Sequence, residues 1–427
     1  MKLFNRETRG QKLSGEQSSM GKKLPKDELL STLERLIPIG QLSTQQLTKL
    51  PVSLKSYDPG EIIYNRGERV SSLDYLFSGE IYLETSGQQN ITVVADTFHA
   101  LYPLGASEYF NATAIARKKA VVLSLPVDVV EHFRQSRKYQ AKNITVPDGL
   151  KNNNLLQRFV SSNELQIPAL PDIAFKLRQA MDEDVGLNEI VKIIALDPSI
   201  SAKLIQIANS PIYRGVAPIT TCHNAIGRLG LNATRNIVTS ISLNSLYRIK
   251  NKQLEKLARY YWNQSVKISA LSHTLAKLTK TCDAEECMLA GLTSQIGIAP
   301  FLKYVSEQPE EQYSFDEVKA ALPFVTSTLS SYVLEKWNFP EQMKYIPLQI
   351  NRWFLLNNSK KPELSDIVLL ARYHSLLGTQ SSKKLPLITS LPSYSIIEDA
   401  ELTPDKSLKI LHDAHQQINK IMQVFSG

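Results

Sequence analysis

Apolar residues recur at helical spacing through residues 163–230, and polar or turn-forming residues divide them into four groups. Residues three and four apart lie on one face of a helix, so each group predicts one amphipathic helix. In chain order, the apolar positions of the four groups are Ile173, Ala174, Leu177, Ala180 and Met181; Ile190, Val191, Ile194 and Leu196; Ile200, Leu204, Ile205 and Ala208; and Ala225, Ile226 and Leu229. So many apolar faces in one short stretch predict helices that pack on one another.

Residues with capping preferences mark the ends of these helices. Pro171 suits a first helical position, where its missing N–H would have no partner in any case. Asp197 is a predicted N-cap with Pro198 in the first turn, and Thr220 can cap the fourth helix. Gly230 can adopt the left-handed conformation that stops a helix.

Five short motifs in this stretch occur in the order seen in one known family. They are Pro-Ala-Leu-Pro at 168–171, Asp-Pro at 197–198, Ala-Lys-Leu at 202–204, Ala-Asn-Ser-Pro at 208–211 and Leu-Gly at 229–230. Through them the chain resembles the HDOD domain, a relative of the HD superfamily found in bacterial signalling proteins. The resemblance implies an all-α output domain, to which we assign residues 156–427, including a C-terminal helical extension.

Residues 24–135 carry a different pattern, in which turn-forming residues recur every few positions. The predicted turns are Asp58-Pro59-Gly60, Asn65-Arg66-Gly67, Ser78-Gly79 and Ser86-Gly87. Short strand candidates lie between and after them, at 61–64, 73–77, 81–84, 91–95 and 120–125. Many short strands at this spacing predict a β jelly roll, closed by a helix at 127–134.

The predicted jelly roll resembles a cyclic-nucleotide-binding domain through Pro59-Gly60-Glu61 and Phe77-Ser78-Gly79. In that family a Phe-Gly-Glu helix start binds the cyclic phosphate, and an arginine about a dozen residues later pairs with it. The resemblance implies a site for a nucleotide-like small ligand at the corresponding positions, Leu104, Gly105, Lys118 and Ala120. However, Ala106 replaces the glutamate, and a lysine lacks the bidentate fork of arginine. We therefore expect weak or absent binding of cyclic nucleotides.

The HD superfamily also implies a metal site, because its enzymes bind metal through a His-Asp pair and further His and Asp residues. The corresponding positions here are Gln264, Ser294, Gln295 and Thr326. None of these side chains is a ligand for the metals that activate water. We therefore expect a pseudoenzyme with no metal, no cofactor and no catalytic residue. Hydrolysis of a nucleotide at an atypical site is an alternative.

Charge and composition add the remaining limits. The net charge is +8, and residues 1–26 hold seven Lys/Arg against two acidic residues. We expect a flexible basic tail at 1–23 and a basic linker at 136–155. The sequence has three cysteines, no apolar run of the ~18 residues that a membrane helix needs, and no secretory signal. These features predict a cytoplasmic protein.

The loop after the third predicted helix carries side chains that suit a protein partner. Asn209, Tyr213 and Arg214 lie there, and Tyr and Arg are frequent anchors of interfaces. We expect the output domain to bind other signalling proteins under control of the sensor domain. The alternative is a DNA-binding transcriptional regulator with a helix-turn-helix at 188–209. Against it, the turn is Asp-Pro-Ser, and Lys203 is the single basic residue of the second helix.

A last apolar stripe predicts a C-terminal helix. Its positions are Leu408, Leu411, His415, Ile418, Met422 and Phe425. The three- and four-residue spacing favours docking on the output domain, with His415 interrupting the stripe. A short coiled-coil seam, which would make a homodimer, is the second interpretation.

Overall fold

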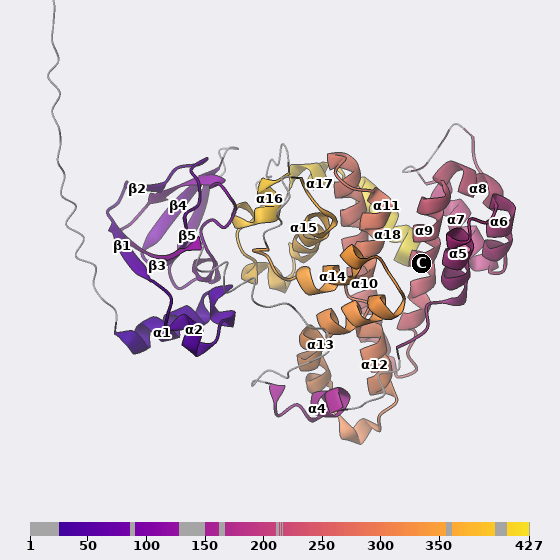
Figure 1. The fold of residues 1–427 in the computed structure, drawn as a ribbon, viewed down its shortest axis with the longest axis horizontal. Coiled ribbons are helices and arrows are strands. Elements are labelled where there is room, and N and C mark those ends of the chain that lie inside the picture. Colours follow the sequence, from indigo (N-terminus) through magenta and orange to yellow (C-terminus); the bar gives the residue numbers. More distant parts are fainter. Residues whose placement is uncertain are drawn as a thin grey trace, which may run out of the picture.

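The computed structural model describes residues 25–85, 90–127, 150–161, 167–210, 213, 215, 217–355, 361–397 and 408–426. Among them, strands lie between residues 53 and 126, and helices form the part from residue 154 onward (Figure 1). This order confirms the predicted fold class, a β domain followed by an all-helical region. The predicted tail, the helix at 127–134 and most of the linker fall outside the described residues.

Two antiparallel sheets form the N-terminal domain. One has the order β1 (Ser53–Tyr57), β7 (Ala120–Pro126) and β3 (Ser72–Ser78), and the other the order β2 (Ile62–Tyr64), β6 (Ala112–Ala116), β4 (Glu80–Thr85) and β5 (Asn90–Val94). Leu76 and Ala120 of the first sheet share an apolar cluster with Ile81 and Leu83 of the second. The sheets therefore face each other, as a jelly roll requires.

Short helices flank these sheets. They are α1 (Lys26–Arg35), α2 (Thr44–Leu47) and the 3-10 turns at Ile39–Gln41 and Phe98–Leu101. In α2, Ser43 and Gln46 form a capping box, because the side chain of each residue bonds the backbone of the other. Ser43 is thus the N-cap residue of α2.

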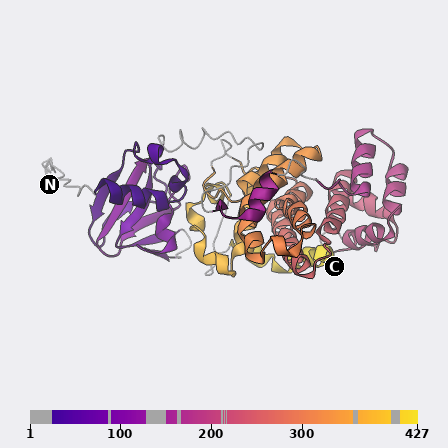
Figure 2. The same ribbon diagram turned by 90° about the horizontal axis from the view of Figure 1, so that it is seen from below.

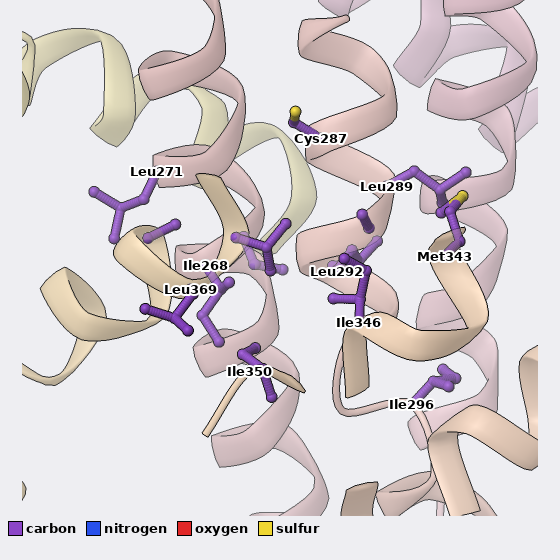
Figure 3. Packing of buried hydrophobic residues seen from close by; sticks show 14 of the residues in the cluster. Ile268, Leu271, Cys287, Leu289, Leu292, Ile296, Met343, Ile346, Ile350 and Leu369 are labelled. Carbon is purple, nitrogen blue, oxygen red and sulfur yellow. The ribbon is translucent and has the colours of Figure 1, made fainter. Parts of the chain in front are cut away.

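The helical region consists of α4 (Asn154–Ser161), α5 (Asp172–Asp182), α6 (Leu187–Ala195), α7 (Pro198–Ala208), α8 (Cys222–Leu229), α9 (Leu231–Leu243), α10 (Lys252–Thr279), α11 (Ala284–Thr293), α12 (Ile298–Ser306), α13 (Phe315–Lys336), α14 (Glu341–Gln349), α15 (Leu364–Leu376), α16 (Pro392–Ser395), α17 (Lys409–Asp413) and α18 (His415–Ser426). Short 3-10 turns lie at Asn244–Tyr247, Glu310–Gln312, Gln380–Lys384 and Ile388–Ser390. Helix α10 is central, since it packs against α11, α15 and α18. Figure 3 shows the apolar side chains that fill the space between these helices, such as Ile268, Leu292 and Leu369.

The four predicted helices of residues 163–230 are α5 to α8. Asp197 caps α7 as predicted, because its Oδ1 accepts the N–H groups of Ser199 at 2.8 Å and Ile200 at 3.2 Å. The predicted cap at Thr220 is wrong by one residue, since the hydroxyl of Thr221 accepts the N–H of Asn224 at 3.2 Å. Gly230 follows the last residue of α8 and has a φ of +83°. Helix α9 begins at the next residue, so Gly230 is the cap of both helices.

The C-terminal stripe docks on the output region, as predicted, because α18 packs against α10. His415, however, does not interrupt a buried stripe. The helix breaks at Ala414, which is buried in its place, and His415 is exposed at the start of α18.

The molecule is elongated in both ribbon views. The sheets lie at one end, α5 to α8 lie at the other, and α10 to α18 lie between them (Figures 1 and 2). Among the described helices, none combines the length and apolar character of a membrane-spanning segment.

Candidate functional site

A contact between residues 102–111 of the N-terminal domain and residues 384–391 joins the two parts of the chain. The hydroxyl of Tyr102 donates to the carbonyl of Lys384 at 2.6 Å. The amide of Asn111 donates to the carbonyl of Thr389 at 2.9 Å, and the Ser107 hydroxyl donates to the carbonyl of Leu391 at 3.3 Å. Side chains of the N-terminal domain thus bind the backbone of a segment from the helical region.

Leu387 is the apolar centre of this contact. It is 4% exposed and belongs to the apolar cluster of the jelly roll, together with Leu104, Phe110 and Ala120. Burial of a leucine side chain contributes roughly 1.5–3 kcal/mol. The helical region therefore supplies one residue of the N-terminal core. Burial raises the pKa of Tyr102 to about 12.

Helix α15 forms hydrogen bonds with the 384–391 segment and with Ser393, which follows it. The hydroxyl of Tyr373 donates to the carbonyl of Pro386 at 2.9 Å. The hydroxyl of Ser393 donates to Oδ1 of Asp366 at 2.7 Å, and Asp366 is buried in the first turn of α15. Since α15 packs on α10, these bonds connect the segment to the centre of the helical region.

The residues predicted to bind a nucleotide-like ligand adjoin this contact, since Leu104 and Ala120 share the apolar cluster with Leu387. The N–H of Leu104 donates to the carbonyl of Asp74 at 2.8 Å, and Tyr64 donates to the carbonyl of Leu104 at 3.3 Å. Gly105 lies against the ring of Phe110, where a Cβ would come within 2.6 Å of a ring carbon. Phe110 stacks on Tyr64 with centroids 3.6 Å apart. The rings of Phe110 and Tyr64 thus pack against the predicted ligand-binding residues.

Lys118, the predicted cation of the ligand site, forms an ion pair with Glu80. Nζ of Lys118 lies 2.7 Å from Oε2 of Glu80, and the guanidinium of Arg117 lies 3.0 Å from Oε1 of the same carboxylate. The hydrogen bond from Lys118 is the largest cause of a lowered pKa of Glu80. Ala120 is fully buried in the jelly-roll cluster. The structure thus places Leu104 and Ala120 in one core and pairs Lys118 with Glu80.

The positions that correspond to HD ligands lie on α10, at the α11–α12 turn and on α13. The Ser294 hydroxyl donates to the carbonyl of Gly291 at 2.7 Å, and the Thr326 hydroxyl donates to the carbonyl of Leu322. Gln295 is buried, and its amide nitrogen has no hydrogen-bond partner among the described residues. Within the same residues, no group of three or more His, Cys, Asp or Glu side chains could hold a metal ion. The hydroxyls therefore satisfy backbone carbonyls of their own helices.

Two residues of the predicted partner loop form hydrogen bonds with other parts of the helical region. The side-chain amide of Asn209 donates to the carbonyl of Ile219 at 2.6 Å and accepts the N–H of Ile219 at 2.8 Å. Tyr213 is half-buried, and its hydroxyl donates to Oε1 of Glu285 at 2.9 Å. Arg214 lies outside the described residues. Because the Tyr213 hydroxyl makes this contact, we expect removal of the Tyr213 side chain to lower the melting temperature.

Hydrophobic periodicity gave no signal for the 384–391 segment or for the Tyr213 contacts. The segment has no helical or strand periodicity, and its carbonyls, not its side chains, make the hydrogen bonds. A run with prolines and leucines at 385–392 in a polar neighbourhood is the one hint that the sequence contains.

Comparison with known proteins identifies the helical region. The family model of the HDOD domain matches residues 167–348. A putative metal-dependent phosphohydrolase from Shewanella amazonensis has a similar structure, with 20% identity, a TM-score of 0.54 and coverage of 63% of this chain and 95% of that chain. Because the identity is low, this likeness shows the fold alone.

Two further solved structures share lower similarity. An HDOD domain protein from Geobacter sulfurreducens is 19% identical, with a TM-score of 0.46, and covers 65% of this chain and 98% of that chain. The sensor domain of the transcriptional regulator DNR from Pseudomonas aeruginosa is 18% identical, with a TM-score of 0.22, and covers 25% of this chain and 80% of that chain. No curated protein matches the chain. The family match confirms the predicted resemblance over part of the helical region: residues 167–348 of this chain form an HDOD domain.

Proposed function

We propose that this chain is a non-catalytic signalling protein whose N-terminal domain controls a helical region that binds other proteins. The observation that carries the proposal is the insertion of Leu387 into the N-terminal core, beside the residues predicted to bind a nucleotide-like ligand. A ligand or partner that reshapes 102–111 would compete with this contact. Its binding would then shift the population of molecules in which the two regions are docked.

The absence of catalysis is part of the proposal. At the four HD positions the chain has side chains that do not bind the usual metals, and two of their hydroxyls are bonded to backbone carbonyls. Gly297, in contrast, keeps a role in packing, because its N–H donates to the hydroxyl of Ser330 at 2.8 Å. These features support an HD-type scaffold that serves as a binding module.

Separation of the two regions by one substitution tests the control step. Leu387→Arg places a charge in the N-terminal core, whereas Leu196→Arg adds the same charge at a leucine that is 64% exposed at the C-terminal end of α6. We expect Leu387→Arg to speed hydrogen exchange in 102–111 and to increase the radius of gyration, with helical circular dichroism retained. Leu196→Arg should leave both quantities unchanged. Equal exchange and equal size in the two variants would contradict the proposed control.

The output is tested by affinity capture with the full chain and both arginine variants. We expect the set of captured proteins to differ between the docked wild type and Leu387→Arg, and to be the same for wild type and Leu196→Arg. An identical set for all three chains would show that docking does not control the output. Recovery of specific DNA fragments instead of proteins would favour the transcription-factor alternative.

A further inference from the structure

A cavity of about 330 Å³ lies in the HDOD domain, apart from the N-terminal contact and from the HD positions. Four helices meet around it: α5, α9, α11 and α14. Its volume lies within the range of small-molecule sites, which starts at roughly 300 Å³. Polar groups line much of this cavity, as a site for a polar ligand requires.

Helix α9 lines the cavity with one polar stripe. Asn232, Arg235, Asn236 and Thr239 are three and four residues apart and lie on the same face. Thr239 is 1% exposed, and its hydroxyl has no hydrogen-bond partner among the described residues. A buried hydroxyl without a partner costs roughly 1–3 kcal/mol.

Other hydroxyls of α9 avoid this cost by bonding the carbonyl one turn back. Thr234 does so with Gly230 at 2.7 Å, and Ser240 with Asn236 at 2.8 Å. Ser242 does the same with Val238 at 2.8 Å. Thr239 is an exception within its own helix, and it lines the cavity. The Thr239 hydroxyl is therefore a buried polar group at the wall of the cavity.

Two arginines give one side of the cavity a positive charge. The guanidinium of Arg178 donates to the carbonyls of Trp337 at 2.9 Å and Asn338 at 2.7 Å, and lies 4.5 Å from the centroid of the Phe339 ring. Arg235 lies near enough to add to the lowering of the Arg178 pKa, of which burial is the larger cause. No hydrogen bond or ion pair engages the Arg235 side chain within the described part of the chain. This charge suits a carboxylate.

Acidic side chains line the cavity from the first turn of α11. One carboxylate oxygen of Asp283 accepts the N–H of Glu286 at 2.7 Å, and one oxygen of Glu286 accepts the amide of Gln342 at 2.7 Å. Each carboxylate retains a second oxygen for another donor. Leu289, Phe339 and Met343 provide an apolar wall, and Figure 3 shows Leu289 and Met343 side by side.

We propose that this cavity binds a small zwitterion of the α-amino-acid class with an apolar side chain. Arg235 and the polar stripe of α9 receive the carboxylate, Asp283 and Glu286 receive the ammonium group, and the apolar wall receives the side chain. A phosphate or another multiply charged anion fits poorly, because Asp182, Asp283 and Glu286 all line the same cavity. A polyamine fits poorly as well, because it would face two guanidinium groups.

Calorimetry on the full chain tests this site with L-leucine, L-methionine and L-phenylalanine as probes. Two half-ligands serve as controls: isopentylamine lacks the carboxylate of leucine, and 4-methylpentanoate lacks its amine. We expect at least one amino acid to bind at concentrations up to about 10 mM, and its half-ligands to bind at least about tenfold more weakly. No binding by any of the three amino acids, or equal binding by a half-ligand, would overturn the proposal.

Substitutions then assign the binding to the cavity. Arg235→Gln and Glu286→Gln should each weaken binding of the amino acid by about tenfold or more, the effect of losing one charge-assisted hydrogen bond. Arg259→Gln, at an exposed arginine on α10, is the matched control and should change nothing. Thr239→Val should raise the melting temperature of the ligand-free chain and weaken binding. Unchanged affinity in Arg235→Gln, with circular dichroism intact, would place the ligand elsewhere.

Discussion

At the scale of single residues, Glu285 is a carboxylate that contacts two side chains of the helical region. Its Oε1 accepts a hydrogen bond from Tyr213 at 2.9 Å and lies 3.6 Å from Nε2 of His273, which is buried. The interaction with the nearby His273 side chain is the largest cause of a pKa of Glu285 lowered to about 2. Lys277 lies over the Tyr213 ring, 5.6 Å from its centroid. The loop that carries Tyr213 is therefore held on α10 and α11.

The lowered pKa of Glu285 predicts a pH dependence of stability. A carboxylate with a lower pKa in the folded state stabilises above its ordinary pKa of 4.5, and this contribution is lost as pH falls toward 2. After allowance for solvent screening of a side chain that is 18% exposed, we expect a loss of roughly 1–2 kcal/mol. Urea unfolding between pH 6 and pH 3 measures it. Glu285→Gln, which retains an acceptor for Tyr213, should show a smaller loss; an equal loss in both chains would contradict the assignment.

At the scale of elements, the approach of α12 to α13 depends on Gly297. A Cβ at this position would lie 2.5 Å from the backbone nitrogen of Ser330 and 2.8 Å from Leu329. Gly297 follows Ser294 and Gln295 in the turn between α11 and α12. The absence of a side chain allows close helix packing there, whether or not the site is catalytic.

This packing predicts opposite effects of two glycine-to-alanine substitutions. Gly297→Ala should destabilise the fold by about 1–3 kcal/mol, since the added methyl group overpacks a buried contact. Gly227→Ala on α8 meets no atom within 4 Å, so it should stabilise the chain by up to about 1 kcal/mol through helix propensity. Thermal unfolding of both variants provides the measurement. A neutral Gly297→Ala would mean that the helices separate without cost.

Local patterns predict elements well where apolar residues follow a simple period or where turn residues mark the ends of an element. The apolar rows of α5 to α8 are of the first kind, and five of the strands are of the second. Strand β6 was missed because it reads Ala-Thr-Ala-Ile-Ala, and alanine has a low strand propensity. Its small residues are explained by the crowded core, in which Ala114 is fully buried beside the stacked rings of Tyr64 and Phe110. Such a tertiary cause has no local signature.

At the scale of the whole molecule, the contact between 102–111 and 384–391 joins segments that are far apart in sequence. Side-chain donors bind backbone carbonyls there, so the identity of the partner residues leaves little trace in the sequence. The HDOD identity of the helical region, in contrast, was predictable from spaced motifs. The sequence therefore indicates the parts, whereas the way in which they are joined requires the structure.

The metal content of the purified chain is a property of the whole molecule. Because Gln264, Ser294, Gln295 and Thr326 stand at the ligand positions, we expect the purified chain to contain far less than one equivalent of iron or manganese and to lack phosphodiesterase activity. Elemental analysis decides the first point and hydrolysis of a chromogenic phosphodiester the second. Near-stoichiometric metal that disappears in Gln295→Ala would contradict this expectation.

The last prediction concerns the ligand of the N-terminal domain. Cyclic AMP and cyclic GMP should bind the full chain weakly or not at all, because Ala106 lacks a carboxylate for a ribose hydroxyl and Glu80 already holds the ammonium group of Lys118. Leu387 adds a further obstacle, since it is buried in the same core as Leu104 and Ala120. Calorimetry on wild type, Lys118→Ala and Leu387→Ala separates these causes. If Leu387 alone blocks the site, Leu387→Ala will bind the nucleotide; if the polar groups are deficient, none of the three chains will bind it. Micromolar affinity of the wild type, about −8 kcal/mol, that is lost in Lys118→Ala would show that the ion pair with Glu80 opens to receive a phosphate.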